Sequence, residues 1–422
     1  MVIHLEKDFN DVALIKKNIK NSKDNYICLN CFDTRERKIK RKDILREPKR
    51  TWLYEECDNC CYNKKGVCTA CPTGDMLYGR DYDYIPVTHR CQIGRKNADG
   101  EVISMSELAC PICKKLIHKV IGENIIISIV GSRDSGKSHY IGVLLYELMH
   151  KLGEQLNWNV VPEENTLKMY DAVFSRLYST KQILSLTDKN HDGYYEPYIF
   201  YVVDSSGKTF TITFFDTAGE DFESDDLMEN SAKHAFNASG IIFLVDPLKI
   251  SNVNSRLDEK TIRNSSSVSI NKTFKIDAIL SIMSTSLRRH NRIKEKKKIA
   301  MPIAVLVPKI DVIASDFPDY YALRFQSNHL KEQGFIEAEN RRVNTEMKKW
   351  LQNQNDGLLD SFLAQLEMNY ENYSFFGASA LGWNNSPDDN GVFMTPKPHR
   401  VEDPFLWILK ENKIINEIKK EV

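Results

Sequence analysis

The sequence predicts an α/β protein in which a mostly parallel sheet is flanked by helices and preceded by a small cysteine-rich module. The apolar run at 125–130 passes through a glycine-containing loop into apolar residues at helical spacing, which indicates a strand, a loop and a helix. Apolar runs without alternation, typical of buried parallel strands, follow at 240–245 and 303–307. All ten cysteines lie between Cys28 and Cys113. We therefore expect two domains, a cysteine-rich module over residues 1–120 and an α/β domain over residues 121–422.

The composition narrows the class of protein further. The chain has 422 residues, is 42% hydrophobic, and balances 58 Lys and Arg against 58 Asp and Glu. This balance argues against wholesale nucleic-acid binding, although basic patches remain at 33–50 and 288–298. A solvated face is the favoured interpretation of both patches; the alternative is contact with nucleic acid at the first and with an acidic partner surface at the second. The amino terminus has no apolar signal core, and no stretch approaches 18 apolar residues. We expect a cytoplasmic protein with no membrane partner.

Eight of the cysteines form four pairs with the same two-residue gap. A C-x-x-C turn presents two thiolates on one side of a knuckle, so four pairs can supply two complete Cys₄ zinc sites. We predict about two Zn²⁺ ions in a zinc-ribbon module. The eight ligands expected are Cys28, Cys31, Cys57, Cys60, Cys68, Cys71, Cys110 and Cys113.

The pairing of these knuckles is open. The two central pairs are close enough to close one compact site, which leaves the outer pairs for a second, nested site. Cys61 and Cys91 are spare, and an ordinary buried thiol is the favoured interpretation for both. His89 could substitute for a cysteine ligand, so an exchange between the sites is also open.

The loop after the first predicted strand has the composition of a phosphate-binding loop. Triphosphate oxygens need several backbone N–H groups turned toward one point, and Gly131 and Gly136 permit the close approach. Lys137 would reach the β and γ phosphates, Ser138 would ligate Mg²⁺, and the helix that begins there would add its positive end. The nucleotide contacts expected here are Gly131, Ser132, Arg133, Asp134, Ser135, Gly136, Lys137, Ser138 and His139.

A second acidic site follows a predicted hairpin. Residues 198–203 and 210–215 read as two strands joined by a turn, after a mixed helix and loop region at 154–189. The second strand runs into Asp216, with Gly219 three residues on. A carboxylate at a strand end is suited to hold Mg²⁺, and the N–H of Gly219 is suited to sense the γ-phosphate.

Two further strand ends carry the chemistry of base recognition. The predicted strand at 303–307 is followed by Pro308, Lys309 and Asp311. The carboxylate of Asp311 can accept hydrogen bonds from both N–H groups on the edge of guanine. The predicted strand at 373–377 ends in Ser379, Ala380 and Leu381, where a backbone N–H would meet guanine O6.

Helices are expected on either side of these strands. They fall at 279–287, at 335–351 and at 358–368, after a polar, serine-rich insertion at 252–271. A last helix is expected to be capped by Asp403, to begin at Pro404, and to be buried through residues 405–418.

With these four segments in order, residues 124–422 resemble the translation-factor-related class of P-loop GTPases, near Ras-like and Arf-like domains. The upstream cysteine knuckles and the segment at 403–407 resemble, more narrowly, bacterial double-GTPase proteins, which are often linked with conflict or defence systems. The resemblance implies a P-loop NTPase fold, GTP or GDP with Mg²⁺ as ligands, and hydrolysis of GTP. It also implies an unknown protein effector, such as another GTPase or a defence-system subunit.

The chain departs from the family pattern at three places. Pro308 stands where the family usually has Asn or Thr, and Glu220 replaces the glutamine that often orients the attacking water. The threonine that would complete the Mg²⁺ shell has no firm alignment: Thr187 is our choice and Thr180 is second. Arg133 in the phosphate loop could stabilise developing charge, or it could be a surface residue.

Three hypotheses follow. The first is a GTPase switch in which Lys137, Arg133, Thr187 and Glu220 act in a slow hydrolysis. The second is a regulator or scaffold that binds nucleotide with little hydrolysis and uses zinc ribbons to bind protein or nucleic acid. The third is an ATPase, because the phosphate loop alone does not choose a base.

Overall fold

The computed structural model describes residues 118–132, 134–184, 196–216, 233–257, 276–383, 385, 387–388 and 390–419, together with short strands upstream. The chain divides into two compact units with a boundary between Ile121 and Gly122. In the first unit, β1 (Asn25–Ile27) pairs antiparallel with β2 (Ile39–Lys40) and with β5 (His118–Val120), and β3 (Arg95–Lys96) pairs with β4 (Val102–Ile103). The predicted zinc ligands lie outside the described residues, so the ribbon assignment stays a prediction.

The second unit contains a seven-stranded sheet with the order β13-β11-β10-β6-β9-β8-β7. Five strands are parallel: β6 (Glu123–Gly131), β9 (Thr209–Asp216), β10 (Gly240–Leu244), β11 (Ile303–Val307) and β13 (Tyr373–Gly377). β8 (Tyr198–Val203) and β7 (Asn159–Pro162) add antiparallel at one edge. The predicted α/β class, the hairpin and the buried parallel strands are confirmed.

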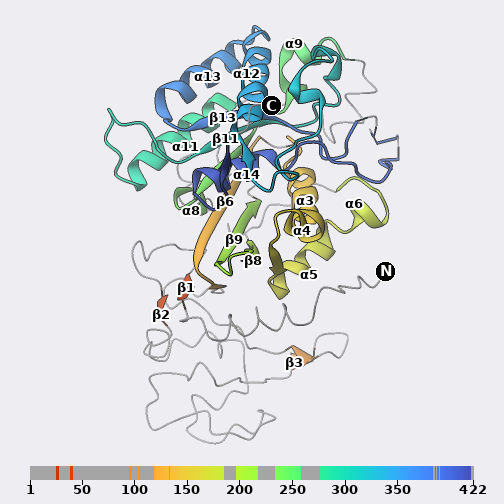
Figure 1. The fold of residues 1–422 in the computed structure, drawn as a ribbon. Coiled ribbons are helices and arrows are strands. Elements are labelled where there is room, and N and C mark those ends of the chain that lie inside the picture. Colours follow the sequence, from red (N-terminus) through yellow and green to blue (C-terminus); the bar gives the residue numbers. More distant parts are fainter. Residues whose placement is uncertain are drawn as a thin grey trace, which may run out of the picture. The chain divides into compact units, whose positions relative to one another are not determined.

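Helices cover both faces of this sheet (Figure 1). α3 (Lys137–Glu147), α5 (Glu164–Val173) and α14 (Asp403–Glu411) pack on one face, and α11 (Ile276–His290), α12 (Glu337–Gln352) and α13 (Gly357–Asn369) pack on the other. Each face of the sheet has its own hydrophobic core, and the central strand β6 contributes to both because successive side chains point to opposite faces: Ile127 and Ile129 belong to the first core and Val130 to the second. A strand buried on both faces has the apolar composition seen at 125–130.

Shorter elements complete the unit. A π-helical turn (Leu148–Leu152) and α4 (Gly153–Gln155) continue α3, and α6 (Arg176–Ser179) follows α5. α8 (Lys233–Phe236) precedes β10, which leads into a 3₁₀ turn (Pro247–Lys249) and α9 (Ser251–Asn254). Two 3₁₀ turns (Ala314–Asp316 and Ala322–Arg324) follow β11. β12 (Phe335–Ile336) pairs parallel with β14 (Glu417–Ile418). Within the described residues no helix is both long and apolar enough to cross a membrane.

Three expectations about local structure are wrong. The last helix is not capped by Asp403: the N-cap is Glu402, and Asp403 lies in the first turn with its carboxylate bound to Arg400. This helix ends at Glu411, and Ile418 belongs to β14. The segment at 154–189 also contains a strand, β7, which pairs with β8 and ends at Pro162. Proline is tolerated there because β7 is an edge strand.

Candidate nucleotide-binding site

The phosphate loop lies where β6 ends and α3 begins, at the carboxyl end of the parallel strands. Gly136 is the N-cap of α3 and has φ +89°, a left-handed conformation that glycine adopts without strain. A Cβ at Gly131 would lie 3.0 Å from the side chain and the carbonyl oxygen of Leu244 in β10, which is closer than ordinary contact. The backbone demands of the loop therefore explain both glycines.

Lys137 is held in place by the loop itself. Its Nζ donates to the carbonyl oxygens of Gly131 at 2.8 Å and Ser132 at 2.9 Å. Burial lowers the pKa of Lys137 from 10.5 to about 8, an effect opposed by the negative charge of Asp216 and reinforced by the positive charge of Lys249. An ammonium group so desolvated is stabilised by an incoming anion.

Ser138 and Asp216 meet next to this lysine. The hydroxyl of Ser138 donates to Oδ2 of Asp216 at 3.3 Å. Burial raises the pKa of the Asp216 carboxyl, while the charge of Lys137 and the Ser138 hydrogen bond oppose that rise. The hydroxyl oxygen of Ser138 thus lies beside a buried carboxylate oxygen, and oxygen atoms are the ligands that Mg²⁺ prefers.

Two polar atoms of the loop are buried and have no hydrogen-bond partner among the described residues: Oδ1 of Asp134 and Oγ of Ser135. Most buried polar atoms in folded proteins have a partner. Unsatisfied groups in a loop of this shape fit a site that takes a polar ligand.

The two predicted base segments come together in space. The backbone N–H of Ile310 donates to the carbonyl oxygen of Ala378 at 3.3 Å. Burial raises the pKa of the Asp311 carboxyl, and the side chain of Ser379 and the charge of Lys309 oppose that rise. Ser379 Oγ also accepts the N–H of Gly382 at 2.9 Å, which closes a tight turn. Within the described residues, nothing accepts a hydrogen bond from the backbone N–H of Ala380 or Leu381.

Lys309 extends from the base segment across the phosphate loop. Its Nζ lies 3.4 Å from the carbonyl oxygen of Asp134, and its Cε lies 3.4 Å from where a Cβ on Gly136 would be. The two segments predicted to hold the phosphates and the base are thus in contact.

His139 ties α3 to the chain at its far side. Its Nε2 accepts the backbone N–H of Leu184 at 3.2 Å. Burial, and then the charge of Lys309, lower the pKa of His139 from 6.5 to about 4, so the ring is neutral at physiological pH. Its side chain therefore fixes the residues just before the segment that contains Thr187.

Two site residues were missed by the sequence analysis, and both follow β10. Asp246 forms an ion pair with Lys309 at 3.2 Å, and Lys249 donates from Nζ to Ser132 Oγ at 3.1 Å. No motif marks them. The available signal was their position after a buried parallel strand, because ligands of such sheets bind outside the carboxyl ends of the strands.

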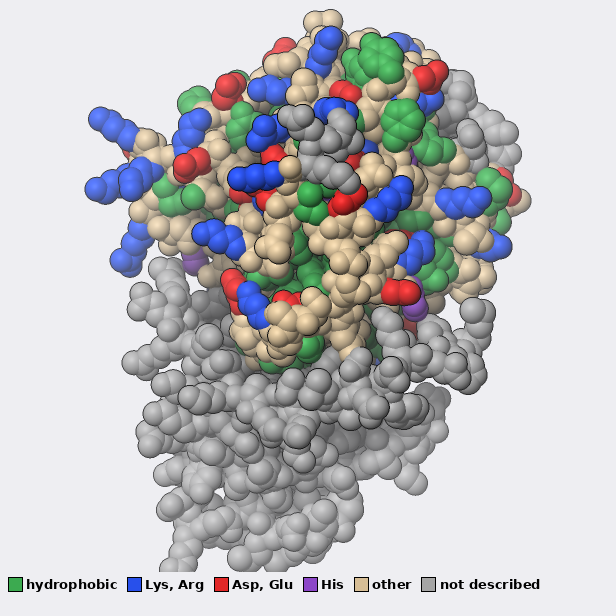
Figure 2. Space-filling view, viewed as in Figure 1, with side chains coloured by type: hydrophobic (Ala, Val, Ile, Leu, Met, Phe, Trp, Pro, Cys, Tyr) green, Lys and Arg blue, Asp and Glu red, His purple; other side chains and the backbone are tan. Residues whose placement is uncertain are grey.

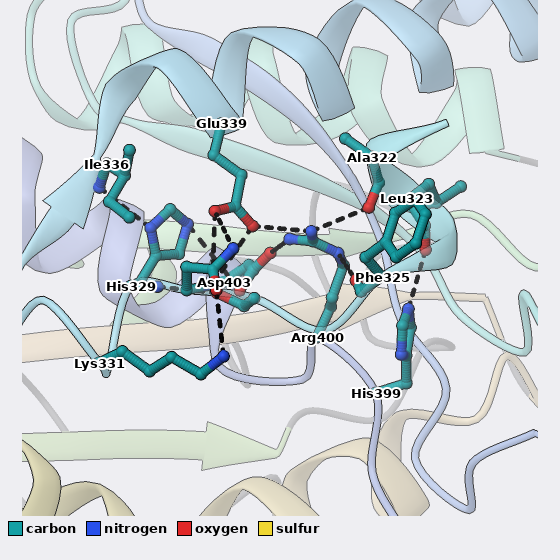
Figure 3. Close-up of polar contacts among 12 residues, drawn as sticks. Ala322, Leu323, Phe325, His329, Lys331, Ile336, Glu339, His399, Arg400 and Asp403 are labelled. Carbon is teal, nitrogen blue, oxygen red and sulfur yellow. Dashed lines mark hydrogen bonds and ion pairs between the residues drawn. The ribbon is translucent and has the colours of Figure 1, made fainter. Parts of the chain in front are cut away.

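A buried ion network surrounds Arg400, next in the chain to His399 (Figure 3). Arg400 donates to Asp403 at 2.6 Å and to Glu339 at 2.7 Å, and also to the carbonyl oxygens of Phe325 at 2.8 Å and Ala322 at 2.9 Å. Its side chain is 1% exposed. Such a guanidinium can be buried because it donates to four acceptors, two of which are carboxylates.

This network supports the base segment through the preceding residue. His399 exchanges backbone hydrogen bonds with Ser379 at 2.9 and 3.0 Å, and its ring hydrogen-bonds with the carbonyl of Leu323 at 2.8 Å. Nε1 of Trp383 donates to the other ring nitrogen at 3.2 Å. The hydrogen bonds with His399 therefore hold Ser379 in place.

Several predicted site residues lie outside the described part of the chain: Arg133, Thr187, Gly219, Glu220 and all the cysteines with His89. Their roles stay predictions. Thr180, the second choice for the Mg²⁺ threonine, is exposed and donates to the carbonyl of Arg176 in its own helix. Within the described residues, no group of three or more His, Cys, Asp or Glu could hold a metal ion.

The basic cluster at 288–298 is partly structural. Arg288 donates to the backbone carbonyls of three residues in the loop after α11 and to Asn369 in α13. The lysines of the loop are exposed. Over the face of the unit drawn in Figure 2, Lys and Arg side chains are interspersed with Asp and Glu, in keeping with the neutral net charge.

The sheet order and the strand–loop–helix unit define an α/β protein of the P-loop GTPase class. A family model for Double-GTPase 2 matches residues 125–364, more than half of the chain, so the chain belongs to this family. The matched range includes the phosphate loop, Asp216 and Asp311 and ends before Ser379. The predicted double-GTPase resemblance is confirmed.

The chain is also similar to a curated protein and to a solved structure. The putative ESX-1 scaffolding and assembly protein SaeC of Mycolicibacterium smegmatis is 27% identical over 157 residues, which cover 36% of this chain and 40% of that protein. The chain thus aligns with less than half of that relative. The Arl6 BBS3 small GTPase from Trypanosoma brucei, solved with the nucleotide analogue GppNp, is 10% identical with a TM-score of 0.29, covering 69% of this chain and 99% of that chain.

Proposed function

We propose that this protein is a Mg²⁺-dependent, GTP-binding cytoplasmic switch that hydrolyses GTP slowly and reports the state of the nucleotide to a protein partner. The observation that carries the proposal is the contact between the phosphate loop, Asp216 and the base segments at one edge of the sheet. Lys309, two residues before Asp311, reaches the carbonyl oxygen of Asp134 at 3.4 Å in the loop that also contains Lys137, so one nucleotide could engage both segments. Membership in a GTPase family supports guanine as the base.

The residues at hand fit a magnesium ion. Ser138 Oγ and Asp216 Oδ2 are 3.3 Å apart, and both are oxygen donors. When bound, Mg²⁺ neutralises charge on the β and γ phosphates. Thr187 is the residue expected to add a third protein oxygen.

We propose one role for each residue of the nucleotide site. Lys137 contributes its remaining N–H to the phosphates, because two backbone carbonyls already orient its ammonium group. Asp311 selects guanine through its carboxylate. Gly219 senses the γ-phosphate, Glu220 positions water and Arg133 stabilises developing charge. Hydrolysis without a partner is expected at about 10⁻⁴ to 10⁻² s⁻¹, as in other switches of this kind.

Single-turnover hydrolysis of GTP tests this proposal. We expect phosphate release from the wild type at the slow rate above, and at least tenfold slower release from Lys137→Ala. Lys168→Ala serves as the matched control, because that lysine is 70% exposed on α5 and pairs with the exposed Glu164. Equal rates in the wild type and Lys137→Ala would contradict hydrolysis at this site. Competition by ATP as strong as by GTP would favour the ATPase hypothesis.

A nucleotide-binding scaffold with little hydrolysis is the second candidate. It is favoured by the name of the SaeC relative, which describes scaffolding and assembly. In this version the predicted zinc module, with about two Zn²⁺ ions, would bind the partner, and a defence-system subunit or a second GTPase would be such a partner. Tight nucleotide binding without turnover, together with a partner that binds only the GTP-loaded form, would distinguish it from the switch.

A further inference from the structure

The turn after β10 contacts both the phosphate loop and the base segment. Asp246 is 1% exposed and begins this turn: its Oδ1 accepts the backbone N–H of Leu248 at 3.1 Å. Three residues later, Lys249 donates to Ser132 Oγ in the phosphate loop. The carboxylate of Asp246 is therefore fixed by its own turn, and the turn is fixed to the phosphate loop.

The partner of this carboxylate is the lysine of the base segment. Lys309 Nζ lies 3.2 Å from Oδ2 and 3.4 Å from Oδ1 of Asp246. Lys309 has φ +56°, a left-handed conformation that costs a non-glycine residue energy and persists only when its surroundings hold it. The same ammonium group reaches the carbonyl oxygen of Asp134 at 3.4 Å.

We propose that Asp246 is a positioning residue for the guanine nucleotide. By holding the Lys309 ammonium across the phosphate loop, it sets the distance between the phosphate loop and Asp311, which is the spacing that the base and the phosphates of one nucleotide must match. This inference rests on the proposed function. It adds a residue that touches neither the base nor the phosphates.

The charge of Asp246 is the essential property in this proposal. A carboxylate that is 1% exposed is costly to bury unless it is paired, so the ion pair holds both partners in one arrangement. Asparagine keeps the shape of Asp246 and its capping oxygen but removes the charge. Lys309, which is 18% exposed, would then be free to turn toward solvent.

The experiment measures the affinity of the full chain for GDP and GTP with Mg²⁺ in four proteins: wild type, Asp246→Asn, Lys309→Gln and the double variant. We expect Asp246→Asn to lower the affinity for GDP and the affinity for GTP by the same factor, about tenfold, because one charge-assisted contact is lost and both nucleotides carry the same base. The single-turnover rate at saturating GTP stays within about twofold of wild type. The double variant binds no more weakly than Lys309→Gln alone, because the two residues act through one contact.

Control variants separate positioning from folding. Asp360→Asn removes an exposed carboxylate from the first turn of α13 and leaves affinity unchanged. Asp246→Glu keeps the charge and stays within about threefold of wild type, so it carries the test even if Asp246→Asn unfolds. Wild-type affinity in Asp246→Asn, or losses that multiply in the double variant, would overturn the inference while leaving the proposed function standing. A wild type that binds no guanine nucleotide would overturn both.

Discussion

The low pKa of Lys137 makes nucleotide affinity depend on pH in a specific way. In the nucleotide-free protein, burial lowers this pKa from 10.5 to about 8. Phosphate oxygens bind the charged ammonium, so bound nucleotide raises the pKa again. Affinity is therefore complete only well below pH 8, where Lys137 is fully protonated, and is lost as the pH rises through 8 and above.

The size of the effect follows from the same value. Lowering the pKa from 10.5 to about 8 corresponds to about 3 kcal/mol against the charged form. A group with a pKa near 8 is about three-quarters protonated at pH 7.5 and about one-tenth protonated at pH 9. The dissociation constant for GDP should accordingly rise about eightfold between these two pH values.

Titration calorimetry between pH 7.5 and pH 9 measures this dependence, in a range above the pKa of the terminal phosphate near 6. Repeating it in buffers of different ionisation enthalpy counts the protons taken up on binding. Lys249→Met provides the control, since the charge of Lys249 helps to lower the Lys137 pKa and its removal should move the loss of affinity to higher pH. A dissociation constant that is flat from pH 7.5 to pH 9, or an equal dependence in Lys137→Met, would refute the reasoning.

Three other predictions concern the base, the core and the metal. Asp311→Asn should lower the affinity for GTP on the order of a hundredfold, because two charge-assisted hydrogen bonds are lost. It should raise the affinity for xanthosine triphosphate, whose carbonyl can accept a hydrogen bond from the new amide. Competition assays measure both affinities, and unchanged selectivity would contradict the prediction. Arg400→Met should lower the free energy of unfolding in urea by about 3–5 kcal/mol, because it leaves two buried carboxylates unpaired. Arg341→Met, which removes an arginine that is 76% exposed, should lower it by less than about 1 kcal/mol. Equal losses in the two variants would show that the network contributes little. Elemental analysis should give about two zinc atoms per chain, and none in folded protein would rule out the ribbon assignment.

The phosphate loop and the strand ends could be predicted because their chemistry is local in sequence. Gly131, Gly136 and Lys137 lie within one loop, and the backbone conformation that the loop needs is the reason for its glycines. Ser379 and Asp311 are 68 residues apart, yet each follows a buried strand, and parallel strands β11 and β13 are neighbours. Their meeting therefore follows from the sheet order.

The residues that escaped prediction depend on contacts that sequence spacing does not encode. Asp246 is a binding partner only because Lys309, 63 residues later, reaches across the loop to it. Asp403 had the sequence position of a helix cap, but the buried guanidinium of Arg400 takes its carboxylate. In both cases an ion pair decides the role of an acidic residue, over 63 residues for Asp246 and over three residues for Asp403.

The strand β7 was missed for a related reason. Its four residues, ending in proline, have a weak strand signal when read alone. They become a strand because β8 offers an open edge for pairing. Edge strands of this length are defined by their partner more than by their own sequence.

Calorimetry with GTP and millimolar Mg²⁺ tests the central claim most directly. The account predicts that one GTP binds per chain, that removal of Mg²⁺ weakens binding, and that Lys137→Ala abolishes it at micromolar nucleotide. A properly folded, metal-loaded wild type that takes up no guanine nucleotide under these conditions would contradict it.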